Sequence, residues 1–240
     1  MCGRYTSTNQ DQLVAEMELA LATDADCAGV LAVAPGFPAG LTSWWAPRCN
    51  VAPTQPAPVV VKREAVATLC LMRWGLVPHW ADDLKIGVTM INARAETAAG
   101  KRPFRDALAR RRCLVAADGF YEWKREGKKR VPFHFTPIGD GPVTFAGIWE
   151  RWKPRDREGA LWVESFAILT VAADPLVTPL HDRMPLVIAP DDRARWMSRE
   201  ELPTEAIADL LVPTPLAGWQ RREVDPWVNA AARERGAVPG

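Results

Sequence analysis

The second residue of the chain, Cys2, places a thiol directly after the initiator methionine. Small residues at this position allow removal of Met1, which would leave the α-amine and the thiol of Cys2 on adjacent carbons. Reference pKa values are about 7.7–8.0 for an α-amine, about 8.5 for a cysteine thiol and about 10.4 for a lysine. Such an amine could therefore condense with an aldehyde near neutral pH, and the thiol could close on the imine to form a five-membered thiazolidine.

Two other interpretations of Cys2 stay open at this point. The thiolate could attack a carbonyl while the α-amine acts as the base, as in glutamine amidotransferases that also begin Cys-Gly. Alternatively, Cys2 could be an ordinary buried residue of the first strand. A single cysteine does not decide between these interpretations. Residues elsewhere in the chain with reactive or charged side chains are therefore needed.

Three further segments hold groups that could transfer protons or bind charge. Asn92 lies with Arg94 in the stretch Ile-Asn-Ala-Arg-Ala-Glu-Thr, and Glu122 stands between two aromatic residues. A carboxylate among apolar groups tends to have a raised pKa and can then transfer protons near pH 7. His181, a frequent proton shuttle, is followed closely by Arg183. Taken singly, Asn92 could be a turn residue, Glu122 an exposed strand residue and His181 a satisfied loop histidine.

The hydrophobic pattern predicts that strands position these groups. Glycine-containing turns separate short apolar runs, which is typical of an antiparallel meander. One hairpin is expected to turn at residues 62–64. The predicted strands are Val59–Val61, Thr68–Trp74, Cys113–Ala117, Phe120–Trp123, Val131–Phe135, Val143–Trp149, Trp162–Ala172 and Pro185–Ala189.

Helices are predicted around this sheet. Residues 8–11 resemble a capping box, which opens a helix to about Ala22 with Leu13, Met17 and Leu21 on one face. Pro103 opens a short basic helix. Two further helices are expected at residues 191–197 and 204–211, irregular chain at 24–48 and 82–89, and extended chain at 48–58, while the tail after Asp225 is left unassigned.

These elements favour one α+β domain over residues 1–240, with its core at about residues 2–224. We expect a curved, mainly antiparallel sheet with a barrel-like core and flanking helices. The 240 residues are long enough to bury such a core.

Composition excludes several classes of protein. Hydrophobic residues make up 48% and charged residues 25%, and the formal net charge is +1, so binding to nucleic acid would need a local basic patch. We expect no signal peptide and no membrane span, because no apolar run approaches roughly 18 residues. Five scattered cysteines fit a reducing cytoplasm. If the source is prokaryotic, we expect a nucleoid-associated location within it. With three histidines and no CxxC pair, neither a metal nor a cofactor is expected, and nothing in the sequence requires more than a monomer.

Six segments together resemble the SOS-response-associated peptidase (SRAP) family, in the family's order, from Met1 to about Ile188 and more weakly beyond. They are Cys2-Gly3-Arg4-Tyr5, Asn50-Val51-Ala52-Pro53, Trp74-Gly75-Leu76-Val77-Pro78, Asn92-Ala93-Arg94-Ala95-Glu96-Thr97, Asp118-Gly119-Phe120-Tyr121-Glu122-Trp123 and His181-Asp182-Arg183-Met184-Pro185. The family captures abasic sites in single-stranded DNA, where the opened sugar presents an aldehyde at C1′. The resemblance implies that Cys2 forms a thiazolidine with that carbon.

The resemblance also assigns roles to the neighbouring groups. Asn92 would hold the Cys2 amine or the sugar, and Glu122 would move protons during imine formation. His181 would assist sugar opening, crosslinking or its reversal, and its division of labour with Glu122 stays open. The term peptidase would here mean removal of Met1, which the protein could perform itself, and a weak lyase activity could arise from the imine.

DNA contacts are implied at a second set of residues. Three arginines would bind phosphates beside the lesion, Thr170 would approach the DNA backbone, and three further residues would stack on flanking bases. The arginines are Arg4, Arg94 and Arg183, and the stacking residues are Pro53, Trp80 and Trp123. The basic runs at 110–112 and 124–130 would either widen the groove or form a solvated surface. The stretches 24–48 and 81–89 are longer than in the family, which makes the transfer to Trp80 the least direct.

Two alternatives to covalent DNA capture remain. The first is an N-terminal-nucleophile hydrolase of the amidotransferase or peptidase kind, although no accompanying amidotransferase motif is found. The second is a non-covalent reader of modified DNA bases in which Cys2 is structural. A denaturing gel with an abasic oligonucleotide would separate all three.

Overall fold

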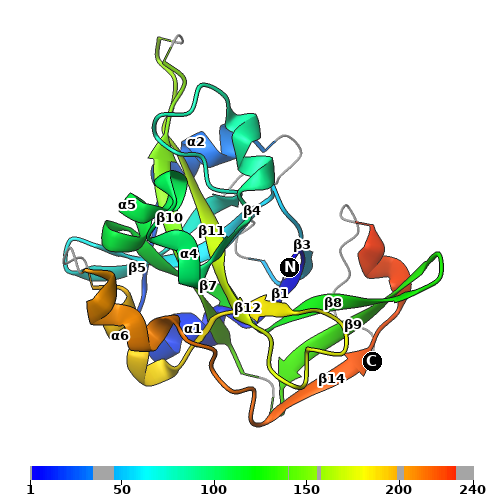
Figure 1. The fold of residues 1–240 in the computed structure, drawn as a ribbon. Coiled ribbons are helices and arrows are strands. Elements are labelled where there is room, and N and C mark those ends of the chain that lie inside the picture. Colours follow the sequence, from blue (N-terminus) through cyan, green and yellow to red (C-terminus); the bar gives the residue numbers. More distant parts are fainter. Residues whose placement is uncertain (1, 35–45, 140, 156–157, 199–202, 231–240) are drawn as a thin grey trace.

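The computed structural model describes residues 2–34, 46–139, 141–155, 158–198 and 203–230 (Figure 1). Its helices are α1 (Gln10–Met17), α2 (Asp24–Ala32), α4 (Ala95–Ala98), α5 (Arg102–Arg110) and α6 (Arg193–Trp196), with 3-10 helices η1 (Leu84–Thr89), η2 (Pro190–Asp192), η3 (Thr204–Leu211) and η4 (Pro226–Asn229). Its strands are β1 (Tyr5–Ser7), β2 (Ala20–Leu21), β3 (Arg48–Val51), β4 (Pro56–Arg63), β5 (Val66–Trp74), β6 (Asn92–Arg94), β7 (Arg112–Ala117), β8 (Gly119–Glu126), β9 (Lys129–Pro137), β10 (Val143–Trp152), β11 (Val163–Ala172), β12 (Arg183–Pro185), β13 (Val187–Ile188) and β14 (Trp219–Glu223). None of the helices in these ranges is long and apolar enough to cross a membrane.

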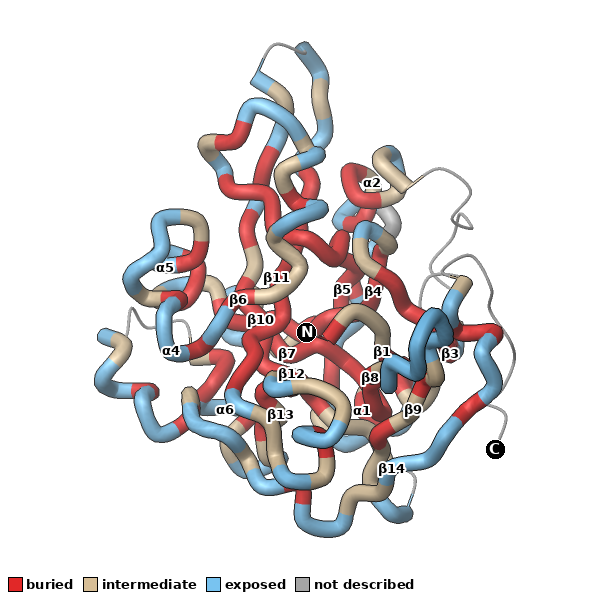
Figure 2. Tube along the Cα trace, turned by 45° about the vertical axis from the view of Figure 1, so that its right-hand side comes forward, coloured by how far each residue is buried: buried red, intermediate tan, exposed pale blue. Residues whose placement is uncertain are grey.

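Five strands close into a barrel, as the sequence predicts. Antiparallel pairings join β5 to β4, β4 to β7, β7 to β10 and β10 to β11. A parallel pairing of β11 with β5, in which Phe166 lies opposite Trp74, then closes the ring. The barrel interior lies on one face of these strands and helices cover the other, which is why β7 and most of β11 are buried on both faces (Figure 2).

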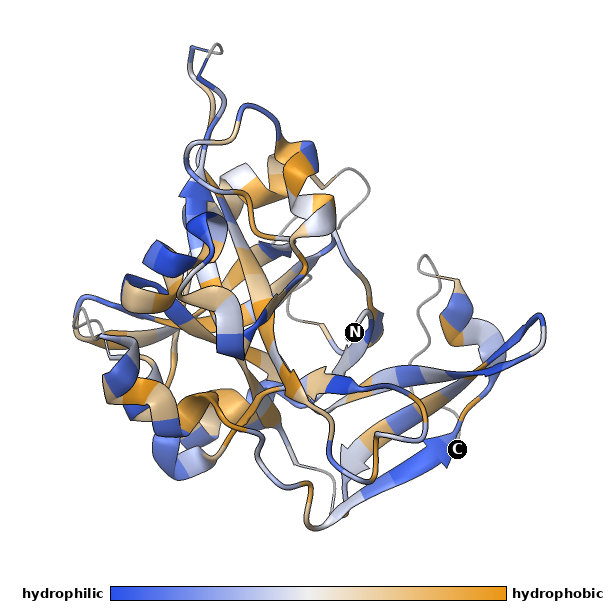
Figure 3. Ribbon diagram, in the orientation of Figure 1, coloured by the Kyte–Doolittle hydropathy of each residue, from blue (hydrophilic) through white to orange (hydrophobic). Residues whose placement is uncertain are grey.

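A second sheet projects from the barrel with the strand order β14-β9-β8-β1-β3. Strand β8 follows β7 almost directly, so the two sheets are joined by the Ala117–Gly119 corner. Strand β14 and the tip of the β8–β9 hairpin are markedly hydrophilic (Figure 3). The start of the chain lies between the two sheets in both views (Figures 1 and 2).

The corner between the sheets requires glycine. A Cβ atom on Gly119 would lie 2.2 Å from the carbonyl oxygen of Phe135 and 2.7 Å from Nε2 of His134. Beside it, the rings of Phe120 and Phe135 stack with centroids 4.9 Å apart. This close approach of β8 and β9 fixes the direction in which β8 leaves the barrel.

The helix predictions at the N-terminal end need correction. Helix α1 begins at Gln10 but ends at Met17, because Glu18 adopts a left-handed conformation with φ 51°. The expected capping box at residues 8–11 is absent, since the Thr8 hydroxyl donates instead to the Asp118 carboxylate at 2.7 Å. Leu21 belongs to β2, which pairs with β5.

The stretch predicted to be irregular at residues 24–48 contains the ordered helix α2. Thr23 and Asp26 form a true capping box at its start: the Thr23 hydroxyl accepts from the Asp26 amide and the Asp26 carboxylate accepts from the Thr23 amide. Helix α2 then packs on β5 and β11. The rest of the prediction falls partly on residues 35–45, which lie outside the described ranges.

Other predictions differ in detail. The loop expected at residues 82–89 contains the 3-10 helix η1, and the helix expected at 204–211 is the 3-10 helix η3. The single strand expected at 185–189 is divided into β12 and β13 at Leu186, whose amide bonds to the Leu169 carbonyl at 2.9 Å. Beyond residue 224, where the core was expected to end, η4 still buries Trp227 and Val228.

Candidate functional site

Cys2 is fully buried at the entrance to β1. Its Sγ lies 3.7 Å from the carbonyl oxygen of Arg4. Burial, and next the charge of Glu122, raise the pKa of the Cys2 thiol well above its ordinary value. The sulfur is therefore held as a neutral thiol and needs a proton acceptor before it can act as a nucleophile.

Asn92 reaches Cys2 from a distant part of the chain. Its Nδ2 donates to the Cys2 carbonyl oxygen at 2.8 Å. Its Oδ1 is buried and has no hydrogen-bond partner in the described ranges. A buried acceptor without a donor is rare and points to a group that arrives later. A donor on the Cys2 amine or on a ligand would satisfy it.

Two aromatic and glycine-rich segments hold Asn92 in this place. Strand β6 pairs in parallel with β11, with Asn92 opposite Ile168. The indole Nε1 of Trp74 donates to the carbonyl oxygen of Ile91 at 2.9 Å. Gly75 and Gly87 pack backbone against backbone, since a Cβ on Gly75 would lie 2.4 Å from the Gly87 oxygen. The Trp-Gly pair at 74–75 therefore helps to position Asn92.

Glu122 lies on β8 beside the first residues of the chain. The amide of the preceding Tyr121 donates to the Arg4 carbonyl at 3.0 Å, which aligns β8 with the segment that carries Cys2. Only 4% of Glu122 is exposed, and burial raises its pKa to about 7. At that value the carboxyl exists in both protonation states near neutral pH, so it can accept and donate a proton in turn.

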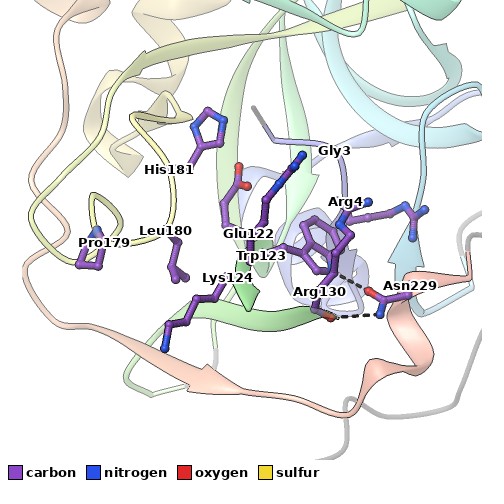
Figure 4. Close-up of a pocket in the computed structure, with 11 residues that line it drawn as sticks. Gly3, Arg4, Glu122, Trp123, Lys124, Arg130, Pro179, Leu180, His181 and Asn229 are labelled. Atoms are coloured by element: carbon purple, nitrogen blue, oxygen red, sulfur yellow. Dashed lines mark hydrogen bonds between the residues drawn. The ribbon is translucent and has the colours of Figure 1, made fainter. Parts of the chain in front are cut away.

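His181 faces Glu122 across the cavity from the loop between β11 and β12 (Figure 4). Its Nδ1 lies 2.9 Å from the amide nitrogen of Arg183 and 2.9 Å from a carboxylate oxygen of Asp182. The ring cannot accept from the amide and donate to the carboxylate through the same nitrogen at once. Burial lowers the pKa of His181, which favours the neutral ring that accepts at Nδ1 and carries its proton on Nε2.

Glu122 and His181 line an open cavity of about 600 Å³ next to Gly3 (Figure 4). Four cations also line the cavity, in contrast to the single carboxylate of Glu122: Arg4, Lys124, Arg125 and Arg130. The other lining residues are Trp123, Pro179, Leu180 and Asn229. The excess of positive charge suits a polyanion such as a DNA strand.

Two of the predicted DNA contacts line this cavity. Nη1 of Arg4 donates to the Val228 carbonyl at 2.6 Å and to Oδ1 of Asn50 at 3.1 Å. The indole Nε1 of Trp123 donates to Oδ1 of Asn229 at 2.6 Å. Both side chains are therefore held by the C-terminal segment around η4. The sequence does not predict these contacts, because this segment has no hydrophobic periodicity.

The other predicted contacts with the DNA backbone, Arg94, Arg183 and Thr170, differ in their exposure and in their hydrogen-bond partners. Arg94 is exposed on β6. Arg183 is engaged by a bidentate pair with the Glu96 carboxylate at 2.6 and 2.8 Å, so a phosphate would compete with Glu96 for it. Thr170 is fully buried and its hydroxyl donates to the Ala93 carbonyl at 3.4 Å. Its carbonyl accepts from Arg183, so Thr170 can orient Arg183 but has no exposed surface for a direct DNA contact.

Pro53 and Trp80 are not among the residues that line the cavity. Pro53 is half-buried in the turn between β3 and β4. The guanidinium of Arg102 lies over the Trp80 ring, 4.4 Å from its centroid. A base could stack on Trp80 only beside Arg102 or in its place.

Comparisons with known proteins bear on the family and the fold of the chain. Residues 1–231 match the model of the SOS response associated peptidase (SRAP) family. The Abasic site processing protein YoaM of Bacillus subtilis is 31% identical over 232 residues, which cover 96% of this chain and 93% of that protein. The Abasic site processing protein YedK of Escherichia coli is 35% identical over 72% of this chain and 75% of its own length. A solved structure from Bacteroides thetaiotaomicron shares the fold, with a TM-score of 0.73, 21% identity and coverage of 93% of this chain and 92% of that one.

Proposed function

Because the chain belongs to the SRAP family, we propose that it processes abasic sites in single-stranded DNA by covalent capture through Cys2. The mature N-terminus forms a thiazolidine with C1′ of the opened sugar and shields the lesion. The observation that carries the proposal is the grouping of Cys2 with Asn92 and Glu122. An amide binds the Cys2 backbone, and a carboxyl with a pKa of about 7 lies beside it in a cationic cavity.

The reaction begins with the sugar. The abasic deoxyribose is a cyclic hemiacetal, and its opening moves a proton from the C1′ hydroxyl to the ring oxygen. His181 is suited to assist, because it lines the cavity and its neutral ring, which accepts at Nδ1, carries an N–H at Nε2. The product is an aldehyde at C1′ and a free hydroxyl at C4′.

Capture then needs a base and an acid in succession. Ionised Glu122 accepts a proton from the Cys2 ammonium, and the free amine adds to the aldehyde carbon. Protonated Glu122 next donates to the carbinolamine hydroxyl, which leaves as water while the nitrogen lone pair forms the imine. The unpaired Oδ1 of Asn92 supplies an acceptor that orients the amine.

Ring closure completes the crosslink. The Cys2 sulfur bonds to the imine carbon, the C=N electron pair returns to nitrogen, and the thiol proton ends on that nitrogen through Glu122. The sum is protein plus DNA less one water. The imine would also permit β-elimination of the 3′ phosphate, and prompt closure by the adjacent thiol suppresses this strand-nicking lyase reaction.

Removal of Met1 is a condition of the reaction, and the burial of Cys2 limits how it can occur. With Met1 in place the α-amine of Cys2 is an amide nitrogen and cannot form an imine. An external peptidase would have to reach a residue that has no exposed surface in the folded chain. We therefore expect removal on the nascent chain or by the protein's own site groups, which would account for the term peptidase.

The test uses a single-stranded oligonucleotide with one abasic site and a duplex with the same lesion. On a denaturing gel, the mature protein should give a shifted band with the single strand, and Cys2→Ala should give none. Intact mass should equal the sum of both partners less one water. Hydrolysis of glutamine or a peptide without any shifted band would favour the N-terminal-nucleophile hydrolase instead, and a band from protein that retains Met1 would refute the aminothiol chemistry.

A further inference from the structure

The segment around η4 forms one wall of the cavity described above. Trp227 and Val228 are buried against Tyr121 and Cys49, which anchors the segment on the second sheet. The carbonyl of Ala230 accepts from Nδ2 of Asn50 at 2.9 Å. This anchoring brings Asn229, more than a hundred residues from β8, to the rim of the cavity.

Asn229 makes a forked contact with β8 and β9 (Figure 4). Its Oδ1 accepts from Nε1 of Trp123 at 2.6 Å, and its Nδ2 donates to the Arg130 carbonyl at 3.3 Å. The guanidinium of Arg130 lies over the Trp123 ring, 5.1 Å from the centroid. The indole is thus fixed at its edge by Asn229, and Arg130 covers one of its faces, so a base would stack beside Arg130 or in its place.

We propose that Asn229 is a positioning residue that holds Trp123 as a stacking platform for the base next to the abasic gap; this rests on the proposed function. Trp123 and Glu122 line the same cavity, so a base on the indole would place its neighbouring sugar near the reacting groups. An indole without a hydrogen bond at its edge can rotate about its side-chain bonds. Each orientation in which the ring faces away from the DNA strand weakens stacking. The hydrogen bond from the indole N–H selects one orientation before DNA arrives.

The size of the effect follows from stacking energies. Removal of an aromatic platform weakens binding by roughly 5- to 150-fold, the range that corresponds to base–aromatic stacking. Asn229→Ala leaves the ring in place and removes only its orientation. We therefore expect a loss of about fivefold in affinity, toward the lower end of that range.

The experiment is a double-mutant cycle that isolates the Asn229–Trp123 contact. The ligand is a single strand that carries a tetrahydrofuran abasic analogue, which has no aldehyde and reports non-covalent binding alone. Affinities are measured by fluorescence anisotropy for the wild type, Asn229→Ala, Trp123→Phe and the double variant. Phe keeps an aromatic face but has no N–H. Gln12→Ala serves as the matched control, because Gln12 is an exposed amide on α1 that donates to Glu16 at 2.8 Å.

Asn229→Ala should weaken binding about fivefold in the wild-type background and leave the Trp123→Phe background unchanged. A 2-aminopurine placed beside the analogue should be quenched by the wild type and less so by Asn229→Ala. Equal losses in both backgrounds, or no loss in either, would overturn the proposal. The cycle is separate from the crosslinking test. If the wild type stacks the base but forms no crosslink, the proposed function is wrong, while the role of Asn229 in holding Trp123 is still supported.

Discussion

Glu122→Gln should separate the stability of the protein from its chemistry. Burial raises the pKa of Glu122 from its ordinary 4.5 to about 7, so the folded chain holds a proton that the unfolded chain releases. Between these two values the native state binds more protons, and wild-type stability must fall as pH rises. At one pH unit per 1.36 kcal/mol, the total loss is about 3 kcal/mol.

Gln has nearly the same shape and no charge, so the variant lacks this pH-dependent contribution to the free energy of unfolding. The free energy of unfolding of the wild type, minus that of Glu122→Gln, should drop by about 3 kcal/mol between pH 4 and pH 8. Above pH 7 this relative gain of the variant should be complete, while its crosslinking is slower than that of the wild type. Urea unfolding of both proteins at intervals of one pH unit measures the difference, and all other titrating groups cancel in the comparison.

Parallel stability curves for the two proteins would refute this reasoning, because they would mean that Glu122 has the same pKa in the folded and unfolded chain. Crosslinking rates provide an independent check. The wild type should show a limb with its midpoint near pH 7, and the Gln variant should lack that limb.

Three other expectations concern single positions. Cys2→Ser should still form an imine but close poorly, so a shifted band should appear only after borohydride reduction; a stable band without reduction would argue against a special role for sulfur. Arg94→Ala should reduce the slope of log affinity against log salt by about 0.7, the value for one phosphate of a single strand, and an unchanged slope would exclude a phosphate contact. Gly119→Ala should destabilise the fold by about 1–3 kcal/mol in chemical denaturation, because its Cβ would meet the Phe135 carbonyl, and a neutral result would show that the corner between the sheets can relax.

The barrel could be predicted because its strands carry their own signals. The runs that end at Trp74, Ala117 and Ala172 are apolar, short and bounded by turn residues, which is typical of strands buried on both faces. Their closure into a ring depends on the parallel pairing of β11 with β5, which joins residues far apart in the sequence. No local pattern specifies that register.

Helix α2 and the start of α1 show where tertiary contacts override local signals. The composition of α2 is rich in alanine and lacks a clear apolar stripe, and its stability comes from the Thr23 cap and from packing on the barrel. Thr8 has the residue type of a cap, but its hydroxyl donates to Asp118, 110 positions away. A single-sequence pattern cannot register a competing acceptor that is distant in the chain.

The site residues divide in the same way. Cys2, Asn92, Glu122 and His181 could be singled out because their segments together resemble the family, although each has an ordinary interpretation when taken singly. Asn229 has ordinary chemistry in an aperiodic tail, and only the folded chain brings it to Trp123. The Glu96 carboxylate on Arg183 is equally invisible in sequence, since 87 positions separate the two.

The burial of Cys2 has a consequence for how the protein endures oxidants. Peroxide and alkylating agents react with exposed thiolates, and their selectivity follows thiolate character and access. A fully buried sulfur with a raised pKa offers neither. In the proposed capture reaction, the thiol would thus be one that such agents reach poorly, and it would react with a carbon that has already bonded to the neighbouring nitrogen.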